Sequence, residues 1–568
     1  LQSDILRKLI YTEGKMVWKA DLKDGTYQNP ILYVDYSDPD AIRVGTDYYM
    51  TASSFCNVPG LPVLHSDDLV NWELIGYALK KIPEFRYREP IHGCGVWAPA
   101  IRYHDGSFYI CFPMPDEGLY MITAKDPAGE WDSPVKIYDG AGLIDPCPFW
   151  DEDGKAYLVC GVAKSRIGYK SVLYMFEMSP DGKRLLSGPV RIYDGTADKN
   201  TTTEGPKLYK RGGFYYIFAP AGGVKTGWQI VLRSKEIYGP YEVRTVMKQG
   251  KTGVNGPHQG AWVTDVAGND WFLHFQDVFA AGRITHLQPM IWSEDGWPVI
   301  GRPSDEDPKV GEPVLNWKKP VISGTGDLGA AKTGGTKKTE KCFGLTDVQG
   351  APALPWQWNA NPQENWVTLS GEEGVLCLNA ACVAGVRPLA DYPSLLLRKW
   401  EAPEFCMEIS LEPKMMEAGG FAGVMALGTI YGGIGVLREK DRWKLLTVTG
   451  SQIFDGGAVY AEEKKEETVL ERGWDLLSFR LEVIPQNQVT ALSWKEEYKE
   501  GDEGKVSHPE SLIRISVWDG KESMLKETAF PASAGRWVGN KYGLFHVCLS
   551  KGENTKNGLA YFKKYKIK

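Results

Sequence analysis

Several features that would assign the chain to a common class are missing from its sequence. No apolar run reaches the roughly 18 residues that a membrane-spanning helix needs. The ten cysteines show no metal-binding spacing such as Cys-x₂-Cys, and in 568 residues they do not form a disulfide framework. The net charge of −7 is too small to indicate binding of nucleic acid or another polyanion. We therefore expect no membrane span, no nucleic-acid partner and no cysteine-built metal centre.

Helical periodicity is also scarce, whereas short β runs and aromatic residues are abundant. Aromatic residues make up 12% of the chain, with 20 Trp and 28 Tyr, which suits strands and sugar-stacking surfaces. At 568 residues the chain is too long for a single core. The sequence therefore predicts an all-β protein of at least two domains.

A repeat is visible from Thr26 onward. A polar or proline-marked turn comes before a hairpin signal and a strand with an aromatic pair, and the second aromatic recurs 48 to 60 residues later. Five sheet-like units of about fifty residues at this spacing predict a five-bladed β-propeller. The recurring aromatic residues are Tyr49, Tyr109, Tyr157, Tyr216 and Phe272.

The turn ahead of each aromatic strand carries a residue that can do chemistry. Equivalent strands of a propeller point at one central channel, so residues that are distant in sequence are expected to converge in space. Three carboxylates, a tryptophan and a histidine around one channel are a plausible set for hydrolysing a sugar bond. These residues are Asp38, Trp97, Asp145, Glu204 and His258.

The chain divides into four parts. Residues 1–25 carry few strand signals and are expected to form an N-terminal arm, and the propeller occupies 26–301. Residues 302–341, rich in Pro, Gly, Thr and Lys toward their end, read as a linker. From 342 to 568 alternating strands without the fifty-residue period predict a β-sandwich of the jelly-roll or concanavalin-like kind. We expect it to brace the propeller and supply a loop to the pocket rim, or else only to stabilise the chain.

An ordered set of motifs resembles glycoside hydrolase family 43, and the resemblance covers nearly the whole chain. Trp356-Gln-Trp-Asn-Ala-Asn-Pro362 is similar to the opening of the accessory sandwich in its β-xylosidase and α-L-arabinofuranosidase branches. The other motifs follow in the family's order: Ser37-Asp-Pro-Asp40, Leu64–Gly76, Gly95-Val-Trp-Ala-Pro99, Ile144-Asp-Pro146, Glu204-Gly-Pro206 and Gly282–Pro289.

The resemblance implies an inverting hydrolase and a role for each polar residue. Asp38 matches the general base, Glu204 the general acid, and Asp145 the residue that tunes and orients the acid. Arg283 matches an arginine that clamps sugar hydroxyls. One departure is that the first turn, Ser-Asp-Pro-Asp, places a second carboxylate, Asp40, beside the proposed base.

Two aromatic residues and a histidine complete the expected site. Phe55 and Trp97 are expected to form apolar walls for one sugar ring. His258 is similar to the channel histidine that holds a water-bound calcium in some family members. No cofactor is required, so calcium in the channel is expected at most as a structural ion. Taken singly, each of these residues also has an ordinary structural explanation as a turn, core or surface residue.

The chemistry explains why three carboxyl groups are needed. An inverting enzyme separates its acid and base by about 6.5–9.5 Å so that a water molecule fits beside the sugar. A glutamic acid with an ordinary pKa of about 4.3 must remain protonated near neutral pH. A nearby anion such as Asp145 would raise the pKa of Glu204, because two close negative charges repel each other.

Several functions stay open at this point. The expected activity is exo-acting release of terminal α-L-arabinofuranose from plant cell-wall polysaccharide or its oligosaccharides, because residues 53–60 resemble the pocket mouth of such enzymes. A β-D-xylosidase, or an enzyme with both activities, is the alternative. A carbohydrate-binding protein without catalysis would not need the carboxylates. The retaining, sucrose-acting propellers carry Arg-Asp-Pro where this chain has Ile144-Asp-Pro146.

The chain begins at Leu1 rather than Met. We therefore expect a mature form from which a signal peptide has been removed, and a periplasmic or secreted location, with a cytoplasmic location as the alternative.

Overall fold

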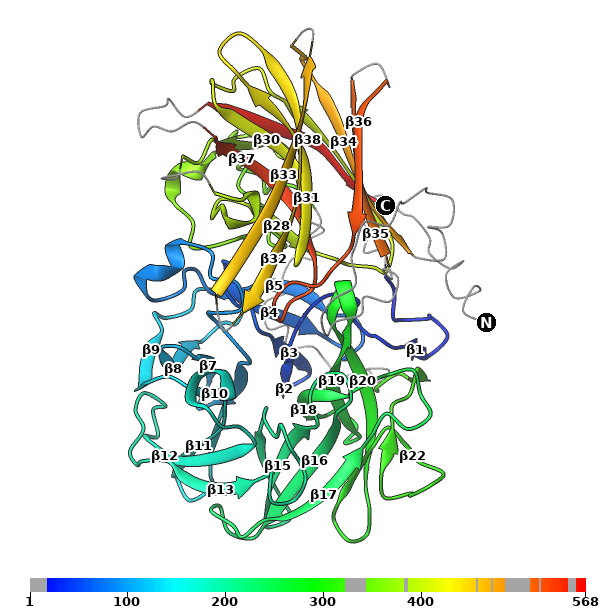
Figure 1. Ribbon diagram of the computed structural model, residues 1–568. Coiled ribbons are helices and arrows are strands. Elements are labelled where there is room, and N and C mark those ends of the chain that lie inside the picture. Colours follow the sequence, from blue (N-terminus) through cyan, green and yellow to red (C-terminus); the bar gives the residue numbers. More distant parts are fainter. Residues whose placement is uncertain are drawn as a thin grey trace, which may run out of the picture.

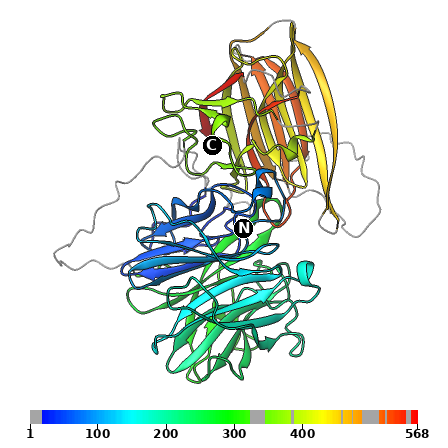
Figure 2. The same cartoon turned by 90° about the vertical axis from the view of Figure 1, so that its left-hand side faces the viewer.

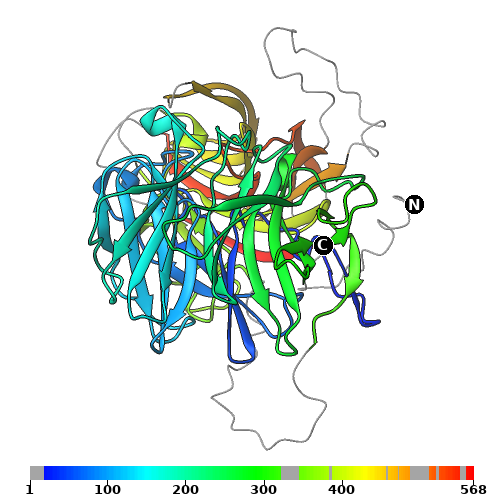
Figure 3. The same cartoon turned by 90° about the horizontal axis from the view of Figure 1, so that it is seen from below.

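The computed structural model describes residues 18–321, 344–382, 387–455, 458–470, 473–485, 511–519, 523–549 and 558–568. The first body is a propeller, drawn blue to green, and the second is a sandwich, drawn yellow to red and stacked above it (Figure 1). Figure 2 shows the same stacking from the side, and Figure 3 shows the propeller in front of the sandwich. No helix among the described residues is long and apolar enough to span a membrane.

Residues 40–300, all of them described, form five antiparallel sheets of four consecutive strands each, which confirms the predicted five-bladed propeller. The first two blades contain β2 (Asp40–Val44), β3 (Asp47–Thr51), β4 (Gly60–Ser66), β5 (Glu73–Leu79), β6 (Ala100–His104), β7 (Ser107–Met114), β8 (Gly118–Ala124) and β9 (Val135–Asp139). The next two contain β10 (Leu143–Trp150), β11 (Ala156–Val162), β12 (Val172–Met178), β13 (Val190–Asp194), β14 (Lys207–Arg211), β15 (Phe214–Ala221), β16 (Trp228–Ser234) and β17 (Glu242–Met247). The fifth contains β18 (His258–Thr264), β19 (Asp270–Val278), β20 (Gly282–Trp292) and β21 (Pro298–Ile300).

Local sequence accounts for the hairpins. The turn between β6 and β7 places Asp105 at φ 45° and Gly106 at φ 71°, and the turn between β14 and β15 places two glycines at positive φ. Two successive left-handed residues make the primed turn whose twist matches paired strands. Aromatic residues of neighbouring blades pack against each other in edge-to-face, tilted or stacked arrangements. The pairs are Tyr49–Phe108, Tyr109–Trp150, Phe149–Tyr215 and Phe218–Phe272, with ring centroids 4.7 to 6.2 Å apart.

The ring closes by packing of β18 against β2, since no strand is exchanged between the first and fifth blades. The chain ahead of β2 secures this closure. Asn29 donates through its amide to the carbonyls of Leu287 and Val314 and accepts from the N–H of Leu287, each at 2.8 Å. Leu32 forms a backbone bridge with Thr285 in β20.

Part of the predicted linker belongs to the propeller. β22 (Arg302–Pro303) and β23 (Gly311–Glu312) extend the sheet of the fourth blade, and β24 (Asn316–Lys318) pairs with β1 (Thr26–Gln28). Residues 322–343 of the linker and 1–17 of the arm lie outside the described residues. The predicted domain boundaries therefore stay a prediction.

The second body consists of two seven-stranded sheets, which confirms the predicted concanavalin-like sandwich. The first sheet contains β25 (Gln357–Trp358), β28 (Leu396–Lys399), β37 (Lys541–Cys548), β30 (Gly420–Leu427), β31 (Ile430–Arg438), β32 (Trp443–Asp455) and β33 (Ala458–Leu470). The second contains β26 (Val367–Thr368), β27 (Leu376–Asn379), β38 (Leu559–Ile567), β29 (Phe405–Glu412), β34 (Leu477–Pro485), β35 (Ser511–Asp519) and β36 (Met524–Pro531). The short helices are η1 (Phe85–Arg88), α2 (Lys164–Ile167), η2 (Phe279–Ala281), η3 (Glu364–Trp366) and η4 (Leu389–Asp391).

The Trp356–Pro362 motif joins the two bodies. Trp358 and Val58 of the first blade exchange both backbone hydrogen bonds, at 2.6 and 3.0 Å. Asn361 adds two amide hydrogen bonds of 2.8 Å to the backbone of Ile82. The sandwich is therefore attached to the blade that carries Asp38.

A network of buried polar contacts, here called the polar girdle, connects the inner strands of four blades. It consists of Asp40, Arg102, Cys147 and the backbone N–H groups of Ile101 and Leu208. Asp40 is fully buried, and its Oδ2 accepts hydrogen bonds from the N–H of Ile101 and from Arg102, both at 2.7 Å. Arg102 also donates to the Cys147 sulfur at 2.8 Å, and that sulfur accepts from the N–H of Leu208 at 3.3 Å. A buried charge pair of this kind becomes costly when one partner is removed.

The girdle predicts that Asp40→Ala lowers the free energy of unfolding of the propeller by about 3–5 kcal/mol, because Arg102 is left with an unpaired buried charge. Asp139→Ala is the control, since that side chain is 86% exposed, and it is expected to change stability by no more than about 0.5 kcal/mol. Denaturant unfolding followed by tryptophan fluorescence measures both. Equal midpoints for the two variants would contradict a stabilising role of the girdle.

Candidate active site

The five candidate site residues at the recurring position lie where the innermost strand of each blade begins. Asp38 and Trp97 come just before β2 and β6, Asp145 is the third residue of β10, Glu204 comes just before β14, and His258 opens β18. The repeat therefore brings these five positions to one end of the ring, as the sequence predicts.

Backbone conformation separates these positions into two kinds. Asp38 and Asp145 are themselves left-handed, both with φ 56°, and each is followed by proline. In the fourth and fifth blades the left-handed residue is the next one, Gly205 at 54° and Gln259 at 40°. A non-glycine residue in this region is strained, and such strain is typical of functional sites. Glu204 and His258 therefore come one residue before the left-handed position of their turns, whereas Asp38 and Asp145 occupy that position themselves.

The Asp38 carboxylate accepts hydrogen bonds from three side chains. Its Oδ2 accepts from the hydroxyls of Ser37 and Ser53, at 2.8 and 2.6 Å, and Arg283 Nη1 lies 3.0 Å from Oδ1. Arg283 also donates to Ser37 Oγ at 2.7 Å. The carboxylate is 5% exposed, so these contacts fix its direction and balance its charge. Asp40 points instead into the girdle, which distinguishes the two carboxylates of the first turn.

Asp145 and Glu204 form the second group. The Gly205 N–H donates to Asp145 Oδ2 at 2.7 Å, which ties the two turns together. Glu204 Oε1 lies 2.9 Å from His258 Nε2, and the Glu204 side chain is 27% exposed. Gly205 has to be glycine here, because a Cβ would come within 2.7 Å of the Gln259 side chain. Glu204 is therefore the carboxyl group of the pair that can reach a substrate.

Burial and like charge together control the proton of this pair. Burial, followed by the nearby charges of Glu204 and Asp38, raises the pKa of Asp145 from 3.8 to about 8. Two carboxyl groups that repel each other at short range retain one proton between them well above the ordinary pKa of either. At neutral pH Asp145 therefore holds a proton. The expectation that Asp145 makes Glu204 the proton donor stays a prediction.

Phe55 and Trp97, the predicted aromatic walls, lie close to each other. Phe55 is two residues after Ser53, exchanges backbone hydrogen bonds with Val96, and its ring centroid lies 6.3 Å from that of Trp97. Trp97 donates from Nε1 to the Gly93 carbonyl at 3.0 Å, and the Arg166 guanidinium lies 4.9 Å from its ring centroid. Both rings are thus held in fixed orientations.

Sequence reasoning missed two acidic residues near Arg283. Asp35 accepts the Arg283 N–H on Oδ1 at 2.9 Å and the Gly539 N–H of the sandwich on Oδ2, also at 2.9 Å. Burial, partly offset by the charge of Arg283, raises the pKa of Asp277 at the end of β19. Neither residue stands at the recurring position, so the repeat carries no signal for them.

Comparison with known proteins identifies the family. Residues 27–298 match the model for glycosyl hydrolases family 43, and residues 349–568 match the beta xylosidase C-terminal concanavalin A-like domain. A provisionally named beta-xylosidase of Xylanibacter ruminicola is 41% identical over 421 residues, 74% of each chain. The chain belongs to glycoside hydrolase family 43. It is therefore an enzyme that hydrolyses glycosidic bonds.

Other family 43 proteins differ in their named activity. A beta-xylosidase of Formosa agariphila is 35% identical over 409 residues, 66% of each chain. A non-reducing end alpha-L-arabinofuranosidase of Bacteroides ovatus is 34% identical over 326 residues, 52% of this chain and 57% of that one. The crystal structure of a xylan beta-1,4-xylosidase of Bacillus halodurans has a TM-score of 0.71 at 23% identity, covering 95% of this chain and 99% of that one. This last likeness concerns the fold alone.

The calcium that the family resemblance suggests has limited support around His258. Calcium prefers six to eight oxygen ligands, whereas His258 uses Nε2 for Glu204 and has an unpaired, buried Nδ1. Among the described residues, the group with metal-ligating atoms close together is Asp47, His65 and Asp67, on the hairpin strands of the first blade. A calcium-bound water at His258 therefore stays a prediction.

The shared proton generates a prediction for this family 43 enzyme. Loss of the proton as pH rises through about 8 should produce the alkaline limb of kcat/KM. Asp145→Asn should move that limb to lower pH, because the neutral amide no longer holds the proton on the pair, and should lower kcat by about 10²–10⁴-fold. Asp139→Asn is the exposed control. An unchanged alkaline limb in Asp145→Asn would show that the limb belongs to another group.

The raised pKa of Asp145 also makes the free energy of unfolding depend on pH. A carboxyl group whose folded pKa lies above its unfolded value binds more protons when folded, so stability falls as pH rises between the two values. For Asp145 this window extends from 3.8 to about 8. Asp145→Asn should therefore reduce the loss of unfolding midpoint across that window.

Asp35 generates a second prediction. Asp35→Ala should lower kcat/KM by about 10–100-fold, because Arg283 loses the acceptor that holds its backbone while small displacements in a site are costly. Asp35→Asn keeps one acceptor oxygen and should fall between Ala and wild type. Steady-state kinetics with a thermal midpoint measured in parallel tests this. An Ala variant with a lowered midpoint and wild-type kcat/KM would limit Asp35 to joining the domains.

Proposed function

We propose that this family 43 enzyme is an exo-acting, inverting β-D-xylosidase that releases terminal xylose from plant cell-wall xylo-oligosaccharides. The observation that carries the proposal is the meeting of three carboxyl groups at one end of the propeller. Asp38 is paired with Arg283, and the charges of Asp38 and Glu204 help to raise the pKa of Asp145. An acid and a base on opposite sides of a sugar are the two groups that inversion needs.

Each residue has one step in the proposed reaction. Asp38 takes a proton from a water molecule, whose oxygen forms a bond to the anomeric carbon. Glu204 gives its proton to the glycosidic oxygen as that bond breaks, and Asp145 keeps the proton available until then. Arg283 and the two rings, Phe55 and Trp97, orient the sugar while its ring becomes oxocarbenium-like.

Xylose is favoured over arabinofuranose by the relatives' names. Two of the three relatives described above are named beta-xylosidases, and the sandwich matches a beta xylosidase domain model. The polar groups of residues 53–60, which suggested arabinofuranose, are largely engaged inside the protein. Ser53 binds Asp38, Ser54 Oγ accepts from the Leu61 N–H at 3.1 Å, and the Asn57 amide donates to the Trp358 carbonyl at 3.4 Å.

The sandwich supports exo action. The N–H of Asn540 donates to the Ala280 carbonyl at 2.7 Å, and Gly539 binds Asp35 beside Arg283. A loop at this position would close one end of the sugar pocket, and a closed pocket accepts a chain terminus rather than an internal residue. The second candidate, α-L-arabinofuranosidase, is favoured by the Bacteroides ovatus relative.

The substrate test compares 4-nitrophenyl β-D-xylopyranoside with the α-L-arabinofuranoside. We expect kcat/KM to be at least about tenfold higher for the xyloside. A tenfold ratio corresponds to a difference of about 1.4 kcal/mol in activation free energy. Proton NMR of the first-formed product should show α-xylose, the inverted anomer. The reverse ratio would assign the enzyme to the arabinofuranosidases, and β-xylose as the first product would contradict inversion.

Leaving-group dependence tests the acid and the base separately. Glu204→Ala should lose about 10²–10⁴-fold in kcat on xylobiose, which needs a proton on its departing oxygen. It should lose much less on a 4-nitrophenyl xyloside, whose leaving group departs as an anion. Asp38→Asn should lose activity on both substrates alike, because water must be activated in either case. Equal losses for both variants on both substrates would contradict the assigned roles.

A further inference from the structure

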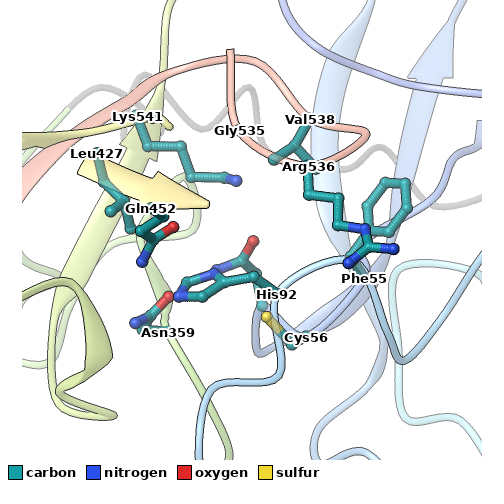
Figure 4. A pocket seen from close by; sticks show the side chains of 13 residues that line it. Phe55, Cys56, His92, Asn359, Leu427, Gln452, Gly535, Arg536, Val538 and Lys541 are labelled. Atoms are coloured by element: carbon teal, nitrogen blue, oxygen red, sulfur yellow. The ribbon is translucent and has the colours of Figure 1, made fainter. Parts of the chain in front are cut away.

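A small cavity lies between the propeller and the sandwich (Figure 4). Phe55 and His92 line it from the propeller, and Gln452, Arg536 and Lys541 line it from the sandwich. Figure 4 shows the Lys541 ammonium and the Gln452 amide extending into the space between the two bodies. The cavity is thus formed only when the two domains are together.

Two buried donors that face this cavity have no partner in the described part of the chain. Lys541 is 5% exposed and makes no hydrogen bond or ion pair there. Gln452 is 2% exposed, and its Nε2 likewise has no hydrogen-bond partner there. Nε2 of His92 also makes no hydrogen bond in the described part of the chain, but it lies 3.9 Å from Asp391 Oδ1. Buried polar groups are nearly always paired, and an unpaired buried ammonium is especially costly. Because these donors converge on one cavity, the cavity is suited to a ligand that carries a hydrogen-bond acceptor.

The charge of the lining specifies the kind of acceptor. Lys541 and Arg536 are cationic, and the lining contains no Asp or Glu among the described residues. Burial lowers the pKa of Lys541, partly offset by the charges of Asp35 and Cys56. Asp35 itself is occupied by the N–H groups of Arg283 and Gly539. The lining is therefore positively charged, and Asp35, which lies outside the lining, is the acid whose charge acts on Lys541.

We propose that this cavity is a carboxylate-binding site, in which Lys541 Nζ and Gln452 Nε2 donate to the two oxygens of one carboxylate group and Arg536 supplies a second positive charge. Charge-assisted hydrogen bonds from an ammonium are among the strongest that proteins make.

The site shares a wall with the sugar pocket. Arg536 lies against Gly93 so closely that a Cβ on that glycine would come within 2.6 Å of Arg536 Cδ. The Gly93 carbonyl accepts the hydrogen bond that orients Trp97, and Phe55 lines the cavity itself. A carboxylate in the cavity can therefore be a free small acid or a uronic acid substituent on the glycan in the neighbouring pocket.

The first experiment measures thermal unfolding of the full-length protein in sodium acetate and in sodium chloride at equal ionic strength. Acetate should raise the wild-type midpoint saturably, by roughly 2–4 °C at ten times Kd. Lys541→Met should abolish the acetate effect, while Lys440→Met, at an exposed turn, should retain it. An equal rise in chloride, or an acetate effect that survives in Lys541→Met, would overturn the proposal.

A second variant guards against a folding failure of Lys541→Met. Gln452→Leu removes the other unpaired donor while keeping a similar volume, and it should weaken acetate binding by about tenfold, the factor expected for one lost hydrogen bond to a charged group. Isothermal titration with acetate measures this directly. Unchanged acetate affinity in Gln452→Leu would remove the amide from the site and overturn the proposed geometry.

The second experiment distinguishes the two sources and rests on the proposed function. Titration of Glu204→Gln with xylobiose, with and without a glucuronic acid substituent, compares a glycan-borne carboxylate with none. Tighter binding of the acidic form by about tenfold, lost in Lys541→Met, would identify the glycan as the source. Equal binding with the acetate effect intact would identify a free carboxylate. Failure of neutral xylobiose to bind would count against the xylosidase proposal, whereas failure of acetate and of the acidic form together would count against the site.

Discussion

Asp145 has 4% of its surface exposed, and its burial together with the charges of Glu204 and Asp38 raises its pKa to about 8. Repulsion at short range is relieved when the pair keeps one proton. The turns of the third and fourth blades are also joined directly, because the Gly205 N–H donates to Asp145 Oδ2 at 2.7 Å. The environment of Asp145 thus depends on a backbone contact that also holds two blades together.

Asp38 differs from Asp145, because donor groups balance its negative charge. Arg283 and two serine hydroxyls surround it and donate to it, whereas Asp145 is buried beside like charges that favour its protonated form. Both aspartates share the same left-handed conformation before proline. Their different chemistry therefore comes from their neighbours and not from their own backbone. A propeller suits this division, because each blade brings a different set of neighbours to an equivalent position.

The sequence was sufficient for what depends on local pattern. Hairpin turns, alternating strands and the recurring aromatic residue predict five blades, and the phase of the repeat predicts that Asp38, Asp145 and Glu204 meet. It was not sufficient where the partner is far along the chain. Asp38 and Asp40 flank the same proline, and only the contact of Asp40 with Arg102 separates a catalytic candidate from a structural carboxylate. Asp35 likewise gains its role from Gly539, more than 500 residues later.

The interface between the domains places charge where hydrophobic contact would be more stabilising. Lys399 donates to the Asp35 carbonyl at 2.7 Å, and burial lowers its pKa from 10.5 to about 8. Lys541 is buried nearby without a hydrogen bond among the described residues. Buried charges of this kind are weak stabilisers and are better explained by the orientation they impose. Because Asp35 binds both the sandwich loop and Arg283, the orientation of the sandwich is transmitted through Arg283 to Asp38. The two domains are therefore coupled at Asp38.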